Sequence, residues 1–154
     1  AHVLNSQNQT CNSDDLEALR DIQKGLKSGT DSWATADCCS WFGIICKSSS
    51  SVGLVSSKRV VGLELGSRKL NGSLPSSFLR LNQLRYLNLS RNFLSGDLPI
   101  NLFVLQNLEV LDLSDNDFSG IFPGNISLPS IQFLDVSQNS LHGTITPSMC
   151  NQST

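Results

Sequence analysis

A ten-residue motif recurs four times in the chain, and the starts of successive copies lie 24, 24 and 23 residues apart. Each copy begins with an apolar-polar-apolar triplet and has glycine as its tenth residue. The copies occupy residues 63–72, 87–96, 111–120 and 134–143. A fixed period of roughly 20–50 residues is typical of proteins in which each repeat is one unit stacked on the next. The period therefore predicts a solenoid whose coils share one core.

The triplet at the start of each copy predicts a short strand. Side chains on a strand alternate between its two faces, so both apolar residues point inward and the polar residue points outward. Stacked copies then form a parallel sheet. Asparagine follows at positions 92, 116 and 139, where its amide can bond backbone groups that the sheet leaves unpaired. The first copy departs from this pattern with Arg68. We expect the amides to form an internal polar row.

Proline follows the glycine of each copy, as in Leu74-Pro75 and Phe122-Pro123, with Ile145-Thr146-Pro147 as an imperfect last copy. Apolar residues over 77–84 and 102–108 then predict short helical turns on the convex side of the solenoid. This is the leucine-rich-repeat pattern, and it resembles the plant-specific subclass, which adds a second short strand. The resemblance implies a right-handed α/β solenoid with its short parallel strands on the concave face.

The segment before the repeats predicts an amphipathic helix. Its apolar residues are spaced by three or four positions, with Asp14 and Glu17 as a capping box at the start and Gly29 near the end. These apolar residues are Leu16, Leu19, Ile22 and Leu26. Trp33 and Trp41 follow the helix, and residues 41–46 and 59–63 are expected to form an antiparallel pair that leads into the first repeat.

Together these features resemble the N-terminal cap of plant receptor ectodomains, which closes the open end of the core. We therefore expect two regions, a cap over residues 1–59 and about four repeats over residues 60–154. The chain is expected to stop before a C-terminal cap, because no capping segment follows the last copy.

Cysteines and glycosylation sequons together favour a secreted protein, since disulfides and N-linked glycans both form in the secretory pathway. The beginning of the chain lacks the features of a signal peptide, so we expect any signal to have been removed. A zinc site is disfavoured because Cys38 and Cys39 are adjacent rather than separated by two to four residues. The cysteines are Cys11, Cys38, Cys39, Cys46 and Cys150, and the sequons begin at Asn8, Asn71, Asn88, Asn125 and Asn151.

Charge and composition exclude several classes of function. A net charge of -2 with 11 Lys plus Arg gives no basic footprint for nucleic acid or an anionic membrane surface, so we expect neither as a direct partner. No apolar run is long enough to cross a bilayer. No Walker loop, nucleophile elbow or metal-binding His motif is present, and the two histidines are far apart. We expect no enzyme activity, no cofactor and no metal in these residues.

Three stretches, residues 4–16, 60–66 and 107–114, are similar to the start of plant leucine-rich-repeat receptor kinases, in particular the phytosulfokine receptor group. The resemblance implies an ectodomain at the outer face of the plasma membrane that binds a small tyrosine-sulfated peptide hormone and recruits a co-receptor kinase. The receptor's own Ser/Thr kinase would lie outside these residues. In this group the hormone docks on a segment inserted between much later repeats, so no hormone-binding residue is carried over.

The same resemblance implies a disulfide from Cys11 to Cys38 and a second from Cys39 to Cys46. From spacing alone, four cysteines allow three pairings, although the adjacent pair points apart on an extended chain and favours different partners. Cys150 is left unpaired here, and the resemblance implies a partner in the next repeat.

Outward positions of the predicted strands supply the candidate ligand-binding residues Tyr86, Asp112, Phe133 and Asp135. Aromatic side chains are natural anchors for partners, but residues in this column also pack against neighbours along a sheet. The acidic column of Glu64, Asp112 and Asp135 is more typical of a solvated concave face than of a paired-carboxylate or cation site. A glycan on Asn88 would block part of this face.

We expect the chain to be the N-terminal portion of the peptide-hormone-binding domain of a receptor. The first alternative is a secreted inhibitor of a pathogen cell-wall hydrolase of the polygalacturonase-inhibitor type, and the second is a purely structural seal. An inhibitor would end after about ten repeats with its own cap, whereas a receptor would continue to a membrane helix and a kinase.

Overall fold

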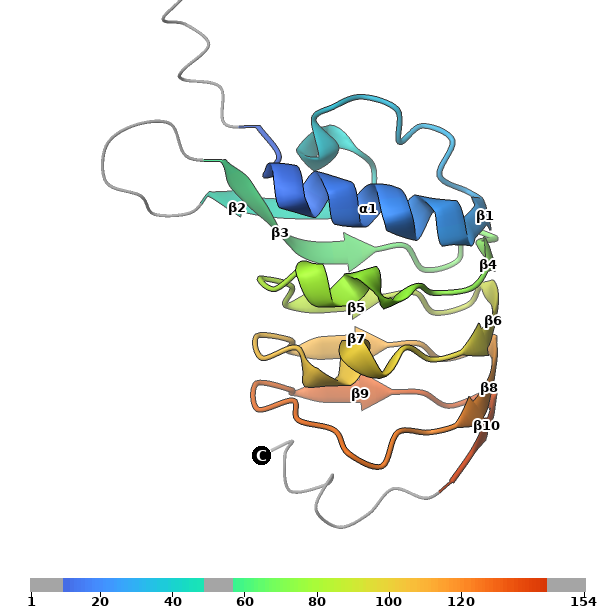
Figure 1. The fold of residues 1–154 in the computed structure, drawn as a ribbon. Coiled ribbons are helices and arrows are strands. Elements are labelled where there is room, and N and C mark those ends of the chain that lie inside the picture. Colours follow the sequence, from blue (N-terminus) through green and yellow to red (C-terminus); the bar gives the residue numbers. More distant parts are fainter. Residues whose placement is uncertain (1–9, 49–56, 144–154) are drawn as a thin grey trace, which may run out of the picture.

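The computed structural model describes residues 10–48 and 57–143, which form a stack of coils around a main sheet (Figure 1). This sheet has five strands in the order β2-β3-β5-β7-β9. The last four pair in parallel, and β2 is antiparallel to β3. The strands are β2 (Ile44–Ser48), β3 (Lys58–Glu64), β5 (Tyr86–Asn88), β7 (Val110–Asp112) and β9 (Phe133–Asp135). The predicted solenoid of short parallel strands is confirmed.

A second sheet lies along one edge of the stack, on the right of Figure 1, in the order β1-β4-β6-β8-β10. It contains the extra strand of each plant-type repeat, and β1 from the cap pairs antiparallel with β4. Gly72 in β4 has φ 107°, and a Cβ there would collide with the carbonyl oxygen of Gly25, so only glycine fits. The strands are β1 (Leu26–Ser28), β4 (Asn71–Gly72), β6 (Phe93–Asp97), β8 (Asp117–Ile121) and β10 (Ser140–His142).

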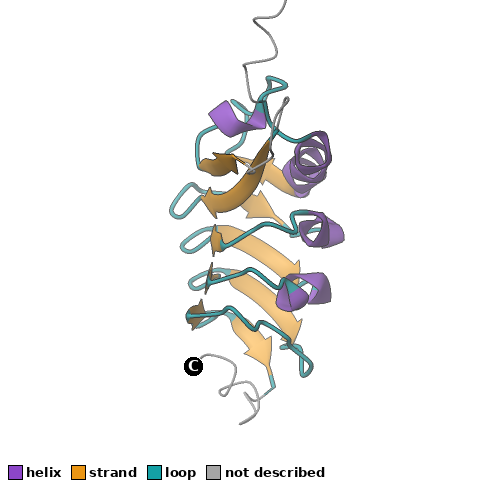
Figure 2. Cartoon of the chain, turned by 90° about the vertical axis from the view of Figure 1, so that its left-hand side faces the viewer, coloured by secondary structure: helices purple, strands orange, loops and turns teal. Residues whose placement is uncertain are grey.

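Helices cover the opposite side of the core from the main sheet. The cap helix α1 (Ser13–Gly25) packs on the 3-10 helix η3 (Ser76–Arg80), which packs on η4 (Ile100–Val104), and the three form a column in Figure 2. Both 3-10 helices begin directly after a proline, whose fixed φ suits a helix start. The short helical turns expected on the convex side are confirmed.

The core consists of the apolar residues of each triplet and an internal row of asparagines. Asn92 is 6% exposed; its side chain accepts hydrogen bonds from Arg68 N and Leu70 N and donates to three backbone carbonyls, at 2.9–3.1 Å. Asn116 and Asn139 repeat the arrangement one and two coils later. The predicted polar row is confirmed. The buried triplet residues include Leu63, Leu65, Leu87, Leu89, Leu111 and Leu113.

The ends of the cap helix differ from the sequence-based expectation. The helix is capped by Asn12, whose side chain accepts hydrogen bonds from Asp14 N and Asp15 N at 2.9 and 3.1 Å, so the predicted Asp14–Glu17 capping box is wrong. Asn12 takes this place because its own backbone N–H is held by Lys58 O, which fixes the chain just before the helix. The helix ends at Gly25 rather than near Gly29, because the next residues leave it to form β1.

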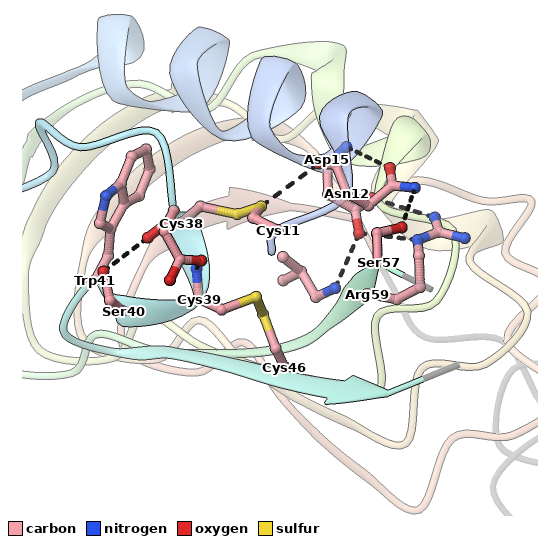
Figure 3. Close-up of a disulfide and its surroundings, with 12 residues drawn as sticks. Cys11, Asn12, Asp15, Cys38, Cys39, Ser40, Trp41, Cys46, Ser57 and Arg59 are labelled. Carbon is pink, nitrogen blue, oxygen red and sulfur yellow. Dashed lines mark hydrogen bonds and ion pairs between the residues drawn. A yellow bond between two sulfur atoms is a disulfide. The ribbon is translucent and has the colours of Figure 1, made fainter. Parts of the chain in front are cut away.

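Two disulfides join segments within the cap, and an ion pair of the buried Asp15 with Arg59 connects the cap helix to strand β3 (Figure 3). Cys11 is bonded to Cys38 and Cys39 to Cys46, the pairing that the family resemblance implies. Asp15 is fully buried and accepts hydrogen bonds from Arg59 Nε at 2.9 Å, Arg59 Nη2 at 3.1 Å and Val60 N at 2.9 Å. The hydrogen bond to Asp15 raises the pKa of Arg59. This carboxylate therefore joins the helix to the first strand of the solenoid.

Aromatic rings pack together inside the cap. The rings of Trp33 and Trp41 stack with centroids 5.1 Å apart, and Trp33 Nε1 donates to Phe42 O at 3.2 Å. Because a buried indole N–H needs a hydrogen-bond partner, this bond fixes the orientation of the stack. The guanidinium of Arg68, which replaces asparagine in the first copy, lies 4.6 Å from the Phe42 ring centroid. Arg68, which breaks the asparagine pattern in the first repeat, thus contacts the cap.

The cap and the first coil share strand β3. This strand pairs antiparallel with β2 along most of its length and parallel with β5 at its end, so the boundary predicted between residues 59 and 60 falls inside one strand. The two regions therefore form a continuous sheet. Cys150, Asn8, Asn151 and the imperfect motif at 145–147 lie outside the described residues.

A candidate recognition face on the main sheet

The outward residues of the main sheet form two columns that run across the coils. Register pairing places Tyr86 beside Val110 and Val110 beside Phe133. It places Asn88 beside Asp112 and Asp112 beside Asp135. Neighbouring strands lie about 4.8 Å apart, so each column is a row of adjacent side chains. We call the two columns together the recognition face: Gly62, Tyr86, Val110, Phe133, Glu64, Asn88, Asp112 and Asp135.

The apolar column is unevenly exposed. Tyr86 and Val110 are half-buried against their neighbours, whereas Phe133 is 49% exposed. The guanidinium of Arg85 lies 5.6 Å from the Tyr86 ring centroid. Tyr86 is therefore held by a cation–π contact, and Phe133 presents the largest free apolar surface of the face.

The acidic column takes part in local turns. Asp112 Oδ1 accepts hydrogen bonds from Ser114 N at 3.1 Å and Ser114 Oγ at 2.7 Å. Asp135 Oδ1 does the same with Ser137, at 3.0 and 2.6 Å. These bonds lower the pKa of Asp135 below its ordinary value of 3.8, the side-chain bond contributing most. Each carboxylate thus fixes the turn after its strand while keeping its second oxygen available.

A polar hollow of about 370 Å³ lies beside the apolar column, and its residues were not singled out from the sequence. Two of its lining residues are paired, because Arg85 Nε donates a hydrogen bond to Glu109 Oε2 at 2.6 Å. The hydrogen bond raises the pKa of Arg85. The sequence contains a signal for this ion pair. Arg85 and Glu109 carry opposite charges and are 24 residues apart, which is one repeat, so they lie side by side in stacked coils. The lining residues are Lys47, Val61, Gln83, Arg85, Asn107, Glu109 and Ser130.

The described residues contain one group of cysteine, histidine or carboxylate side chains close enough together to share a metal ion. That group is Cys11, Cys38 and Cys39, and all three sulfurs are in disulfides, so the group is structural. Asp112 and Asp135 do not form such a group with any third residue described here. Over residues 10–48 and 57–143, no helix has both the length and the apolar character needed to cross a bilayer.

The three sequons within the described residues differ in environment. Asn71 and Asn125 are exposed, whereas Asn88 is half-buried in the acidic column. Asn88 Oδ1 accepts a hydrogen bond from Ser90 N at 3.0 Å, the same turn that the aspartates make. Asn88 is therefore part of the face, and a glycan there would stand among the candidate recognition residues.

Family models match both regions of the chain. A model described as "Leucine rich repeat N-terminal domain" matches residues 12–47, and one described as "Leucine Rich Repeat" matches residues 83–105, 107–128 and 130–152. The first contains the cap helix, the Cys39–Cys46 disulfide and most of β2. The second coincides with the coils that contain β5, β7 and β9.

Similar proteins are plant receptors. Phytosulfokine receptor 1 of Arabidopsis thaliana is 43% identical over 151 residues, which are 94% of this chain and 12% of that protein. The leucine-rich-repeat ectodomain of the receptor kinase SOBIR1 from Arabidopsis thaliana aligns with a TM-score of 0.76 and 34% identity, over 87% of this chain and 71% of that one.

The Arabidopsis receptor kinase HAESA, solved with the peptide hormone IDA and the co-receptor SERK1, aligns with a TM-score of 0.74 and 31% identity, over 92% of this chain and 24% of that one. The chain thus spans about an eighth of the receptor that it matches in sequence. It belongs to the leucine-rich-repeat family, with a cap and coils of the kind found in plant receptor kinase ectodomains.

Proposed function

We propose that this chain is the N-terminal portion of the extracellular hormone-binding domain of a plant receptor kinase of the phytosulfokine-receptor kind. The observation that carries the proposal is the 43% identity to Phytosulfokine receptor 1, which extends through both cap and repeats. The related ectodomain of HAESA, which binds a peptide hormone together with a co-receptor, supports it. The chain would lie on the outer side of the plasma membrane.

The role we assign to it is that of a non-catalytic scaffold. The cap closes the core through the buried Asp15–Arg59 pair and two disulfides, and the coils present a continuous face for partners. The kinase that transmits the signal would lie elsewhere in the receptor. The partners would be a tyrosine-sulfated peptide hormone and the ectodomain of a co-receptor kinase.

Within this scaffold, we propose Tyr86, Asp112, Phe133 and Asp135 as the residues that contact a partner. Phe133 offers exposed apolar area, and aromatic residues commonly anchor interfaces. Asp112 and Asp135 are held in one rotamer by their serine partners, so an incoming donor would meet preorganised carboxylate oxygens.

A chimeric receptor tests this assignment. The chain would replace the matching N-terminal region of the Phytosulfokine receptor 1 ectodomain, and affinities for the sulfated peptide and for the co-receptor would be measured by calorimetry. Alanine at Tyr86 and Phe133, or asparagine at Asp112 and Asp135, should weaken one of these affinities at least tenfold, about 1.4 kcal/mol. Asparagine keeps the turn but removes the charge.

Ile121→Ser provides the matched control, because Ile121 is 81% exposed but lies on the second sheet. It should leave both affinities unchanged. If the recognition-face variants also leave both unchanged, these four residues are not a binding site and the chain is only a structural seal.

A further inference from the structure

Asn71 and Phe93 lie next to each other on the outer surface of the second sheet. Strands β4 and β6 are parallel, and Asn71 is the register partner of Phe93. The adjacent residues Leu70 and Leu94 are fully buried, so alternation along each strand turns Asn71 and Phe93 outward. Register partners on neighbouring strands are about 4.8 Å apart, which brings the amide and the ring into reach of one group.

The side-chain amide of Asn71 is oriented by the backbone N–H of the next residue. Its Oδ1 accepts a hydrogen bond from Gly72 N at 2.7 Å, and among the described residues its Nδ2 has no partner. Asn71 begins the sequon Asn71-Gly72-Ser73, in which both the asparagine and the serine are exposed. The nitrogen that receives an N-linked glycan is therefore free and at the surface.

Phe93 is unusual for an aromatic residue in this chain. It is 65% exposed, it is not part of the core cluster, and it makes no ring contact within the described residues. An exposed phenyl ring gains by burial of its apolar area. The C–H face of a pyranose sugar is a flat apolar surface of suitable size, and a sugar on Asn71 would be attached beside the ring.

We propose that Asn71 carries an N-linked glycan whose first N-acetylglucosamine packs against the ring of Phe93. In the modification, Asn71 Nδ2 forms a bond to C1 of that sugar and loses a proton, while the bond from C1 to a lipid-pyrophosphate donor breaks and the pyrophosphate leaves with the electron pair. The glycan would cover the exposed aromatic side chain of this sheet and leave the recognition face open. This inference is independent of the hormone-binding proposal.

The other described sequons lack this arrangement. Asn125 is exposed but lies outside the strands, so no aromatic residue is its register partner. Asn88 is half-buried and is flanked in register by Glu64 and Asp112 rather than by an aromatic residue. Only Asn71, among the described sequons, combines a free amide nitrogen with an exposed aromatic partner.

The test uses the chain secreted from mammalian cells that make only high-mannose glycans. Glycopeptide mass spectrometry measures occupancy at Asn71, and endoglycosidase H then leaves a single N-acetylglucosamine. Compared with Asn71→Gln, this single sugar should raise Tm by about 2–4 °C. The gain should remain in Phe93→Tyr, which keeps a ring, and disappear in Phe93→Ser and Phe93→Leu.

Proton NMR gives a readout that does not depend on stability, because ring current should shift the C–H signals of the first sugar upfield in the wild type and in Phe93→Tyr but not in Phe93→Ser or Phe93→Leu. Phe133→Ser is the matched control, since Phe133 is also exposed but lies on the main sheet, and it should leave both the Tm gain and the shifts intact. An unoccupied Asn71, an equal Tm gain with and without the Phe93 ring, or unshifted sugar signals in the wild type would each overturn the proposal.

Discussion

The cap and the coils are stabilised in different ways. The cap depends on contacts that occur once, such as the buried Asp15 carboxylate and the stack of Trp33 on Trp41. The coils depend on contacts that recur with the repeat, such as the hydrogen bonds of Asn92 and Asn116. A lost contact in the cap has no equivalent elsewhere, whereas a lost contact in the coils leaves similar ones on either side. Substitutions should therefore cost most in the cap, and the predictions below test that ordering.

Asp15→Ala should have the largest effect. It leaves the Arg59 guanidinium and Val60 N without their buried partner, and breaking a buried pair costs about 3–5 kcal/mol. Urea unfolding measures the loss. Asp21→Ala is the control, because its pair with Arg80 is on the surface, where ion pairs contribute about 0–1 kcal/mol. Equal losses for the two variants would show that Asp15 does not secure the cap.

The two disulfides should rank next, and in a fixed order. The bridges join residues 27 and 7 positions apart, for which loop-closure entropy predicts about 3.5 and 2.5 kcal/mol respectively. Replacing Cys11 and Cys38 by serine should thus lower the free energy of unfolding more than replacing Cys39 and Cys46. Chemical denaturation of both double variants measures the difference. The reverse order would mean that the short bridge does more than restrict the unfolded chain.

Asn92→Ala should cost about 2 kcal/mol, because it leaves Leu70 N and several carbonyls unsatisfied inside the core. Asn139→Ala should cost less, since Asn139 is half-exposed and water can replace part of its bonding. Thermal unfolding of both variants compares an inner coil with an outer one. Equal costs at both positions would show that the asparagine row does not act through burial.

The smallest effect should come from acid titration of Asp135. Its folded pKa lies below the ordinary 3.8, so the carboxylate form is favoured by folding. The contribution is therefore full above about pH 4 and is lost as pH falls through the folded pKa. Asp135→Ala should lower Tm slightly at pH 7, and the gap to the wild type should narrow below about pH 4. A Tm difference between Asp135→Ala and the wild type that does not change with pH would show that the hydrogen bonds of the Asp135 carboxylate to Ser137 do not cause it.

Periodic features could be predicted from the sequence because they depend on local alternation repeated every coil. Leu63, Leu87 and Leu111 face inward and the asparagine row forms as expected. The start of the cap helix is harder to predict from the sequence, because all four residues of Asn12-Ser13-Asp14-Asp15 can cap a helix. Only the contact of Asn12 with Lys58 selects among them. The end of the helix depends on β1 pairing with β4, which is far along the chain.

The recognition face was predictable in position but not in detail. The outward columns follow from strand alternation, yet the serine bonds that fix Asp112 and Asp135 depend on turn geometry. The role of Asp15 was not predicted at all, since a carboxylate in the first turn of a helix is normally solvated and its partner Arg59 is 44 residues away. Contacts that occur once give no pattern to detect.

The central claim is that this chain supports a hormone-binding domain without holding the hormone alone. Calorimetric titration of the tyrosine-sulfated peptide into the glycosylated chain, beside the chimera with the later repeats of Phytosulfokine receptor 1, tests it most directly. The account predicts binding heat with the chimera and none with the chain. Binding of similar affinity by the chain itself would contradict the account and would place the hormone site on the face around Tyr86 and Asp135.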